Sequence, residues 1–194
     1  MQRTPRVGGE LVKRTFLGVD PGLRSGGAAI VDEMGRPLLL AGWYGGRYYQ
    51  SIPAGRIWLD LPAGGSGAQS ALMQWTASGV TRAGAAIEQP LTTGVGRHAD
   101  TWRSVGHWEQ AARERCPDVR LVPYRTWVRA ADIAGSDGVA EVRRRVRELT
   151  AHLDPMLPAG AQSRGGWPSQ ARDAAREAYL IARWCALQDG GGGA

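Results

Sequence analysis

The chain has 194 residues, enough for one domain with a buried core. Lys and Arg number 24 against 18 Asp and Glu, and the net charge of +6 makes nucleic acid the favoured partner. Cys116 and Cys185 lie far apart without CxxC spacing, which argues against a disulfide framework or a structural zinc site. No apolar run approaches the ~20 residues of a transmembrane helix, so we expect a cytoplasmic protein without a membrane partner.

The two ends of the chain differ in composition from its middle. Residues 1–14 are basic and lack the apolar core of a secretory signal, which predicts a flexible arm. Residues 189–194 are rich in glycine and predict a disordered tail. A single domain is therefore expected over residues 15–188.

Three apolar runs follow one another at the start of this domain, at residues 15–20, 27–32 and 37–43. Short turns rich in Pro and Gly link them, which predicts an antiparallel meander. Residues 44–65 are rich in Gly, Pro and Tyr, and they predict no regular element.

Helices and strands alternate in the remainder. Apolar residues at helical spacing predict helices over 66–78, 97–116, 138–153 and 169–187, and compact apolar runs predict strands over 83–88 and 119–123, with a loop at 154–167. This order predicts an α/β fold with a five-stranded mixed sheet, its first three strands antiparallel, and helices on both faces. It is the element order of the ribonuclease H-like fold.

Four carboxylates occupy notable positions in this pattern. Asp20 and Glu88 each end a predicted strand, and Asp173 and Glu177 are four residues apart on one face of the last helix. If the two strands are neighbours, the acids converge. Four such acids suit two Mg²⁺ or Mn²⁺ ions, which prefer oxygen ligands and can together promote phosphodiester cleavage.

Each acid has a plainer interpretation when taken alone. Asp20 precedes Pro and Gly and is also a typical turn residue. An Asp/Glu pair on a helix is commonly a solvated face. The metal hypothesis rests on the combination of all four, in this order and spacing.

At these residues the chain resembles the RuvC-type Holliday junction resolvases, and more closely the shorter RuvC-like nucleases of phages. The shared motifs are GxDPGxxxxG, present as GVDPGLRSGG over residues 18–27, and a second-acid run, present as AIEQ over residues 86–89. The last helix carries DAAREA over residues 173–178, which is the phage-type DxxxEA form. The pair Thr126-Trp127 is also similar to that branch.

The resemblance implies a homodimer that binds four-way DNA junctions and nicks two strands, in a bacterial or phage-infected cell. Two Mg²⁺ or Mn²⁺ ions per active site would be held by the four acids. By motif position Asp20 would contact both ions, and Glu88 and Asp173 would be further ligands. Glu177 takes the place of the fourth acid, one residue later than in DxxD members, which is a rotation of ~100° around a helix.

Two positions depart from the family pattern. An aromatic residue that wedges open the junction in bacterial members is replaced by Leu91, which can still act as an apolar wedge. The family's active-site Lys is also missing. Glu141 lies nearest, and one of the arginines beyond it would have to supply the positive charge. Candidate DNA-binding residues are Arg24, Leu91, Arg97, Arg143, Arg144 and Arg147.

The aromatic and histidine residues admit two interpretations. Trp43, Tyr44, Tyr48 and Tyr49 could stack on unpaired bases, but packing of an irregular loop on the sheet is the simpler explanation. Trp102 and Trp108 suit core or dimer contacts. His98 and His107 suit surface or cap roles better than the positioning of a water.

Two rival functions remain beside a metal-dependent, structure-selective DNA endonuclease. A non-catalytic relative that binds branched DNA is compatible with the loss of the aromatic wedge. An actin-like or sugar-kinase ATPase also begins with a strand and DxG, but such folds need two domains, and 194 residues are too few. Within the nuclease class, the sequence does not separate a junction resolvase from a broader debranching or flap nuclease.

Overall fold

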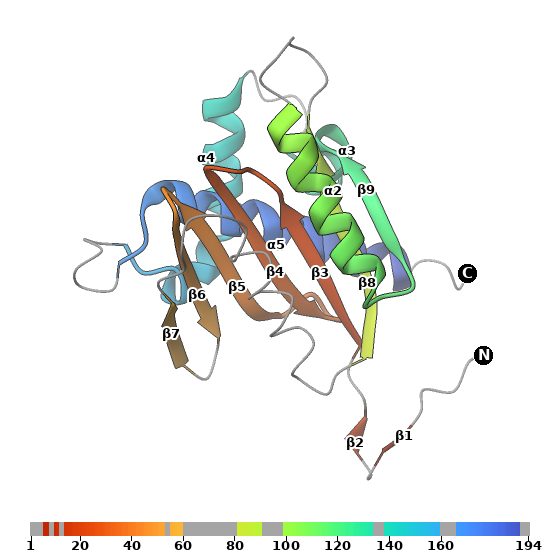
Figure 1. Cartoon of the computed structure of the whole chain (residues 1–194). Coiled ribbons are helices and arrows are strands. Elements are labelled where there is room, and N and C mark those ends of the chain that lie inside the picture. Colours follow the sequence, from red (N-terminus) through yellow and green to blue (C-terminus); the bar gives the residue numbers. More distant parts are fainter. Residues whose placement is uncertain are drawn as a thin grey trace.

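A computed structural model describes the chain over residues 6–7, 10–11, 14–52, 55–59, 81–90, 99–133, 138–159 and 166–190 (Figure 1). The predicted helix at 66–78 and the side chains of Leu91, Arg97 and His98 lie outside the described residues. The predicted arm contains two short strands, β1 (Arg6–Val7) and β2 (Glu10–Leu11), which pair antiparallel.

One mixed sheet organises the domain, in the strand order β7-β6-β5-β4-β3-β8-β9. Strands β3 (Arg14–Asp20), β4 (Ser25–Asp32) and β5 (Pro37–Tyr44) form the predicted antiparallel meander. Strands β8 (Thr81–Gln89) and β9 (Val119–Pro123) continue the sheet from β3 in parallel pairing. The mixed α/β sheet is therefore confirmed.

The prediction of five strands is wrong, because β6 (Arg47–Ile52) and β7 (Gly55–Leu59) extend the meander. Gly45 and Gly46 form the two-residue turn between β5 and β6, with φ of 58° and 80°. Positive φ at both central residues is the geometry that hairpin turns require and glycine readily adopts. The Gly-Gly pair is thus a hairpin signal within a segment whose composition predicted no regular element.

Helices cover both faces of the sheet, as expected (Figure 1). Helix α2 (Ala99–Arg113) packs on one face and α5 (Ser169–Gly190) crosses the other. Because side chains alternate along a strand, each strand contributes to two separate cores. On β3, for example, Leu17 and Val19 belong to the core under α2, whereas Phe16 belongs to the core under α5.

Helix α5 lies against the sheet at very short range. A Cβ placed on Gly18, Gly27 or Gly42 would stand 2.2–2.3 Å from backbone atoms of α5. These glycines lie on β3, β4 and β5, and the helix residues they face are Ala171, Ala174, Ala178 and Ala182. Small residues on both sides let the helix backbone contact the strands directly, which fixes the height of α5 above the sheet.

The remaining helices pack beside α5. Helix α3 (Tyr124–Ala130) follows β9 at once and was not predicted. Helix α4 (Val139–Leu149) occupies the first part of the predicted 138–153 helix, and a 3-10 helix, η1 (Ala151–Met156), takes over from it. The buried Arg176 of α5 joins these elements, since it hydrogen-bonds Thr150 Oγ1 at 3.3 Å and forms an ion pair with Asp154.

The two ends of the domain meet. Arg14, the first residue of β3, forms an ion pair with Asp189 near the end of α5. The last helix therefore continues beyond the predicted Leu187 and includes the first residues of the predicted Gly-rich tail.

Candidate active site

Two neighbouring parallel strands bring Asp20 and Glu88 together. Val19 of β3 pairs with Ile87 of β8, and each carboxylate is the next residue along its strand. Alternation turns both side chains away from the α2 core, which holds Val19 and Ile87, and toward the face that α5 covers. The two strands that end in Asp20 and Glu88 are therefore neighbours, as the convergence of these acids requires.

Helix α5 brings the other two acids to the same place. Gly27 pairs with Asp20 across β3 and β4, and it faces the backbone of Ala174. Asp173 and Glu177 flank this contact point. A pocket of about 190 Å³ results, and its lining includes Asp20, Asp173 and Glu177 together with Ser25, Arg143, Arg147, Ser169, Gln170 and Ala174. Residues from β3, β4, α4 and α5 thus share one pocket.

Asp20 is held at the start of a turn. Its Oδ1 accepts a long hydrogen bond of 3.4 Å from the Gly22 backbone N–H. Burial raises the pKa of Asp20 to about 7, although this hydrogen bond and the charge of Arg143 both lower it. The folded chain therefore makes Asp20 costly to ionise, and a nearby cation would relieve that cost.

Glu88 and Glu177 are also costly to ionise, because their pKa values are raised. Burial raises the pKa of Glu88 well above its ordinary value, and the charges of Asp20 and Glu177 raise it further. The pKa of Glu177 is raised to about 8, first by burial and then by the charge of Asp20. These mutual effects require the three carboxylates to be close neighbours in a poorly solvated space.

Trp127 donates a hydrogen bond to Glu88 that lowers the pKa of this carboxyl group. Its indole Nε1–H donates to Glu88 Oε2 at 2.7 Å, and the ring itself is buried. Helix α3 positions the ring, and its backbone begins directly after β9, the neighbour of β8. In the sequence, Trp127 is notable only through the resemblance of its motif to the phage-type branch. Its contact with Glu88 depends on α3, which the apolar pattern did not reveal.

Asp173 differs from the other three acids because it has a cationic partner. Arg147 of α4 donates from Nε to Oδ1 at 2.8 Å and from Nη2 to Oδ2 at 2.6 Å. Both carboxylate oxygens are therefore engaged by one guanidinium. Arg143, one helical turn earlier, lies in the same pocket and acts on Asp20 and Glu177 through its charge.

The donor set has the chemistry that a hard divalent cation requires. Asp20, Glu88 and Glu177 are oxygen ligands, are poorly hydrated, and repel one another without a positive charge between them. As the side chains lie, however, no three His, Cys, Asp or Glu residues in the described part of the chain are close enough to hold one metal ion together. Asp173 and Glu88 each have another partner, Arg147 and Trp127 respectively.

The other predicted DNA-binding residues have varied surroundings. Arg24 is exposed in the turn after β3. Arg144 is paired within α4, with Nε donating to Glu141 Oε2 at 2.8 Å and a second ion pair to Glu148. Leu91 and Arg97 stay predictions, because they lie outside the described residues.

The aromatic residues at 43–49 belong mostly to the cores. Tyr48 and Tyr49 are each 3% exposed, on opposite faces of β6. Trp43 donates its indole N–H to the Gly22 carbonyl at 2.7 Å and stacks on Trp108 at a centroid distance of 5.9 Å. The packing interpretation is thus favoured over base stacking, although the segment is a strand pair and not the irregular loop expected.

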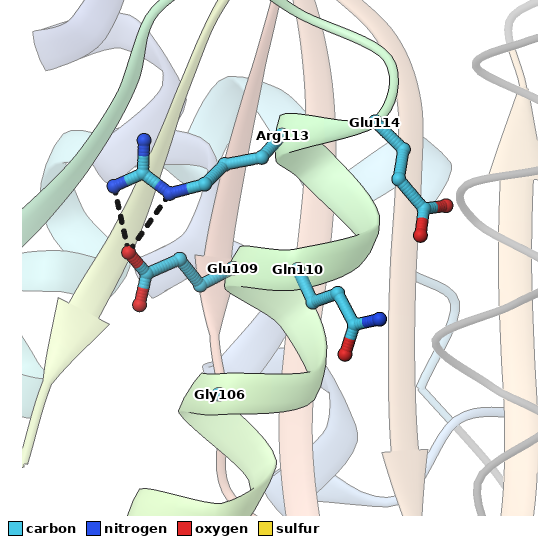
Figure 2. A pocket seen from close by; sticks show the side chains of 5 residues that line it. All are labelled: Gly106, Glu109, Gln110, Arg113 and Glu114. Atoms are coloured by element: carbon cyan, nitrogen blue, oxygen red, sulfur yellow. Dashed lines mark hydrogen bonds and ion pairs between the residues drawn. The ribbon is translucent and has the colours of Figure 1, made fainter.

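The outer surface of α2 carries a separate hollow, on the other side of the sheet from the carboxylates. Figure 2 shows its lining, which consists of Gly106, Glu109, Gln110 and Arg113 of α2 and Glu114 just after the helix. Arg113 donates a hydrogen bond back to Glu109 at 2.7 Å. Nearby, Trp108 is buried in the core as expected, Trp102 is 38% exposed and His107 is exposed.

Comparison with known structures supports a RuvC-like fold. The chain resembles T. thermophilus RuvC in complex with a Holliday junction substrate, with a TM-score of 0.52 and 19% identity over 92% of this chain and 96% of that one. A second Thermus thermophilus RuvC structure aligns over 92% and 97% of the two chains, with 16% identity and a TM-score of 0.48. At such identities the likeness concerns the fold alone.

The sequence itself matches no protein-family profile and no curated protein. Among the described residues, no helix is both long and apolar enough to cross a membrane.

Proposed function

We propose that this protein is a metal-dependent, structure-selective DNA endonuclease of ribonuclease H-like fold, with residues 15–188 as its nuclease domain. The observation that carries the proposal is the convergence of Asp20, Glu88 and Glu177, from two parallel strands and a helix, in a poorly solvated space. Buried carboxylates that repel one another are unfavourable for stability. Such an arrangement is characteristic of sites where ions are bound.

Asp20, Glu88, Asp173 and Glu177 would hold the metal, either Mg²⁺ or Mn²⁺, as two ions per site. When bound, such ions activate a water molecule and stabilise the leaving oxygen of a phosphodiester. Asp20 is the central ligand in this assignment, since its charge affects both Glu88 and Glu177. Asp173 would join once Arg147 releases it.

The chain's own cations would bind and orient the DNA backbone. Arg143 and Arg147, both on α4, line the same pocket as Asp20, Asp173 and Glu177. A guanidinium binds phosphate oxygens through two parallel hydrogen bonds, so it fixes the orientation of the phosphate as well as its position. We assign the role of the family's missing Lys to Arg143, because its charge reaches both Asp20 and Glu177.

A four-way DNA junction is the proposed substrate. The T. thermophilus protein that shares this fold is described with a Holliday junction substrate, and the present chain has a net charge of +6. We further propose a homodimer, which would allow two symmetric nicks, and membership of the phage-type branch on account of Trp127 and the DxxxEA motif.

The decisive experiment incubates the protein with four-way junction, fork, flap and duplex DNA in Mg²⁺ and in Mn²⁺, and maps the nicks. We expect nicking of the junction that requires the metal, and its loss in Asp20→Asn with junction binding retained. Glu109→Gln, which removes a carboxylate from the outer surface of α2, serves as the matched control and should cleave normally. Full cleavage by Asp20→Asn would refute the proposal.

A non-catalytic junction-binding protein is the second candidate. It is favoured by the ion pair of Arg147 with Asp173 and by the spacing of the acids, which in the described residues does not yet suit one ion. Tight junction binding without cleavage in either metal would establish this alternative.

A further inference from the structure

An ion pair joins α4 and α5 at the pocket, and the role inferred for it rests on the proposed function. Arg147 and Asp173 are 26 residues apart and meet through two hydrogen bonds of 2.8 and 2.6 Å. The side chain of Arg147 is 52% exposed, whereas that of Asp173 is 17% exposed. The guanidinium therefore remains open to solvent and to any ligand that enters the pocket, while the carboxylate points inward.

This contact competes with metal binding at Asp173. Both carboxylate oxygens accept hydrogen bonds from a positive group, so a divalent ion approaching Asp173 would meet a like charge within a few ångströms. Asp173 must exchange its partner before it can act as a ligand. The three other acids have no such contact in the described structure, and the indole of Trp127 at Glu88 carries no charge.

A phosphate group is a suitable replacement partner for Arg147. It offers the guanidinium the same pair of oxygen acceptors as a carboxylate and carries at least as much negative charge. Arg143 lies one turn earlier in the same pocket, so an entering phosphate would meet two guanidinium groups. Arg144 and Arg145 differ, because both pair with Glu141 and Glu148 of their own helix.

We propose that Arg147 is a substrate-responsive positioning residue, which holds Asp173 in the free protein and releases it to the metal when a DNA phosphate replaces the carboxylate. The metal site would then be complete only when DNA is bound. Because such coupling is reciprocal, the metal should also strengthen phosphate binding at Arg147.

The first test measures Mn²⁺ affinity without DNA, by calorimetry or by the electron paramagnetic resonance of free Mn²⁺. We expect Arg147→Gln to raise the affinity about two- to five-fold, the range that a partly exposed ion pair allows. The matched control is Arg143→Gln, which removes the same charge from the same pocket without touching Asp173. In an Asp173→Asn background the gain from Arg147→Gln should disappear, whereas any gain from Arg143→Gln should persist.

The second test needs no metal. Binding of a fluorescent four-way junction in EDTA should tighten in Asp173→Asn, and this gain should be lost when Arg147→Gln is also present. Glu177→Gln removes a neighbouring charge that Arg147 does not contact, so its effect on binding should be the same with and without Arg147.

The outcomes separate this inference from the proposed function. Equal gains in Mn²⁺ affinity from Arg147→Gln with Asp173 intact and with Asp173→Asn, or no gain when Asp173 is intact, would overturn the inference and leave the nuclease proposal intact. Failure of the unaltered protein to bind Mn²⁺ even when a four-way junction is present would overturn both.

Discussion

The two faces of the sheet pack against their helices in different ways. On the α2 face, large side chains such as Trp108, Leu17 and Ile87 fill the space between helix and strands. On the α5 face, Gly18 and Gly27 let the helix backbone contact the strands directly, and ionisable groups lie among the buried residues. Close backbone packing brings acidic side chains from three elements together on one face, whereas packing of bulky side chains mainly supplies stability on the other.

The largest expected loss of stability comes from a substitution in the core under α2. Trp108 is 2% exposed and stacks on Trp43, so Trp108→Ala should lower the free energy of unfolding by about 3–5 kcal/mol, because it leaves a cavity. Denaturant titration measures the loss. Trp102, 38% exposed on the same helix, is the matched control and should change stability by about 0.5 kcal/mol or less when replaced by Ala. Similar losses at the two positions would contradict the assignment of the α2 core.

The next largest loss comes from a substitution where α5 contacts the sheet. Gly18→Ala adds a Cβ 2.2 Å from backbone atoms of Ala178 and Ala182, which the helix can accommodate only by moving. We expect a loss of about 1–3 kcal/mol in unfolding free energy, together with weaker Mn²⁺ binding, because Glu177 moves with α5. Gly106→Ala on α2, where nothing lies within 4 Å, should instead gain about 0.5–1 kcal/mol. A neutral Gly18→Ala would show that the helix packs less closely than described.

The buried acids on the α5 face should make the stability of the protein depend on pH. The pKa of Asp20 is raised to about 7 and that of Glu177 to about 8, so the folded protein keeps protons that the unfolded chain has released. Stability without metal should therefore be highest near pH 4–5 and fall as the pH rises through about 8. The melting temperature at each pH measures this fall, which Asp20→Asn should reduce. A melting temperature that rises over this interval would contradict the burial of the acids.

The smallest expected effect follows from removal of one hydrogen-bond donor, the indole N–H of Trp127. Trp127→Phe keeps a buried ring but leaves Glu88 Oε2 without its hydrogen bond. We expect a loss of about 1 kcal/mol in unfolding free energy and a change in Mn²⁺ affinity, measured by denaturation and calorimetry. Trp167, equally buried in the same core at 1% exposed, provides the control, since Trp167→Phe should leave Mn²⁺ affinity unchanged. Equal Mn²⁺ affinities for both variants would show that Trp127 does not position Glu88.

The sequence predicts those parts of the site that strand and helix periodicity determine. Asp20 and Glu88 end apolar strands, and Asp173 and Glu177 share one side of a helix, so their convergence follows once the strands are neighbours. The meander and the α5 helix were predicted for the same reason, because their apolar patterns are long and regular.

The features that were missed depend on contacts between distant segments. Nothing local in the sequence indicates that Arg147 would reach Asp173, 26 residues away, or that Trp127 would reach Glu88, 39 residues away. Helix α3 is only seven residues long, too short for its apolar spacing to be distinctive. The hairpin turn at Gly45 and Gly46 was the one omission that a local signal could have prevented.

The ion pair between Arg14 and Asp189 has a practical consequence for experiments. Chain that leaves the domain on either side departs from a single corner, at the opposite end of β3 from Asp20 and roughly 20 Å from it. A fluorophore or affinity handle attached at that corner would stand clear of the acidic pocket. The same proximity makes the domain a good candidate for circular permutation, with a short linker joining the old ends and new ones opened elsewhere.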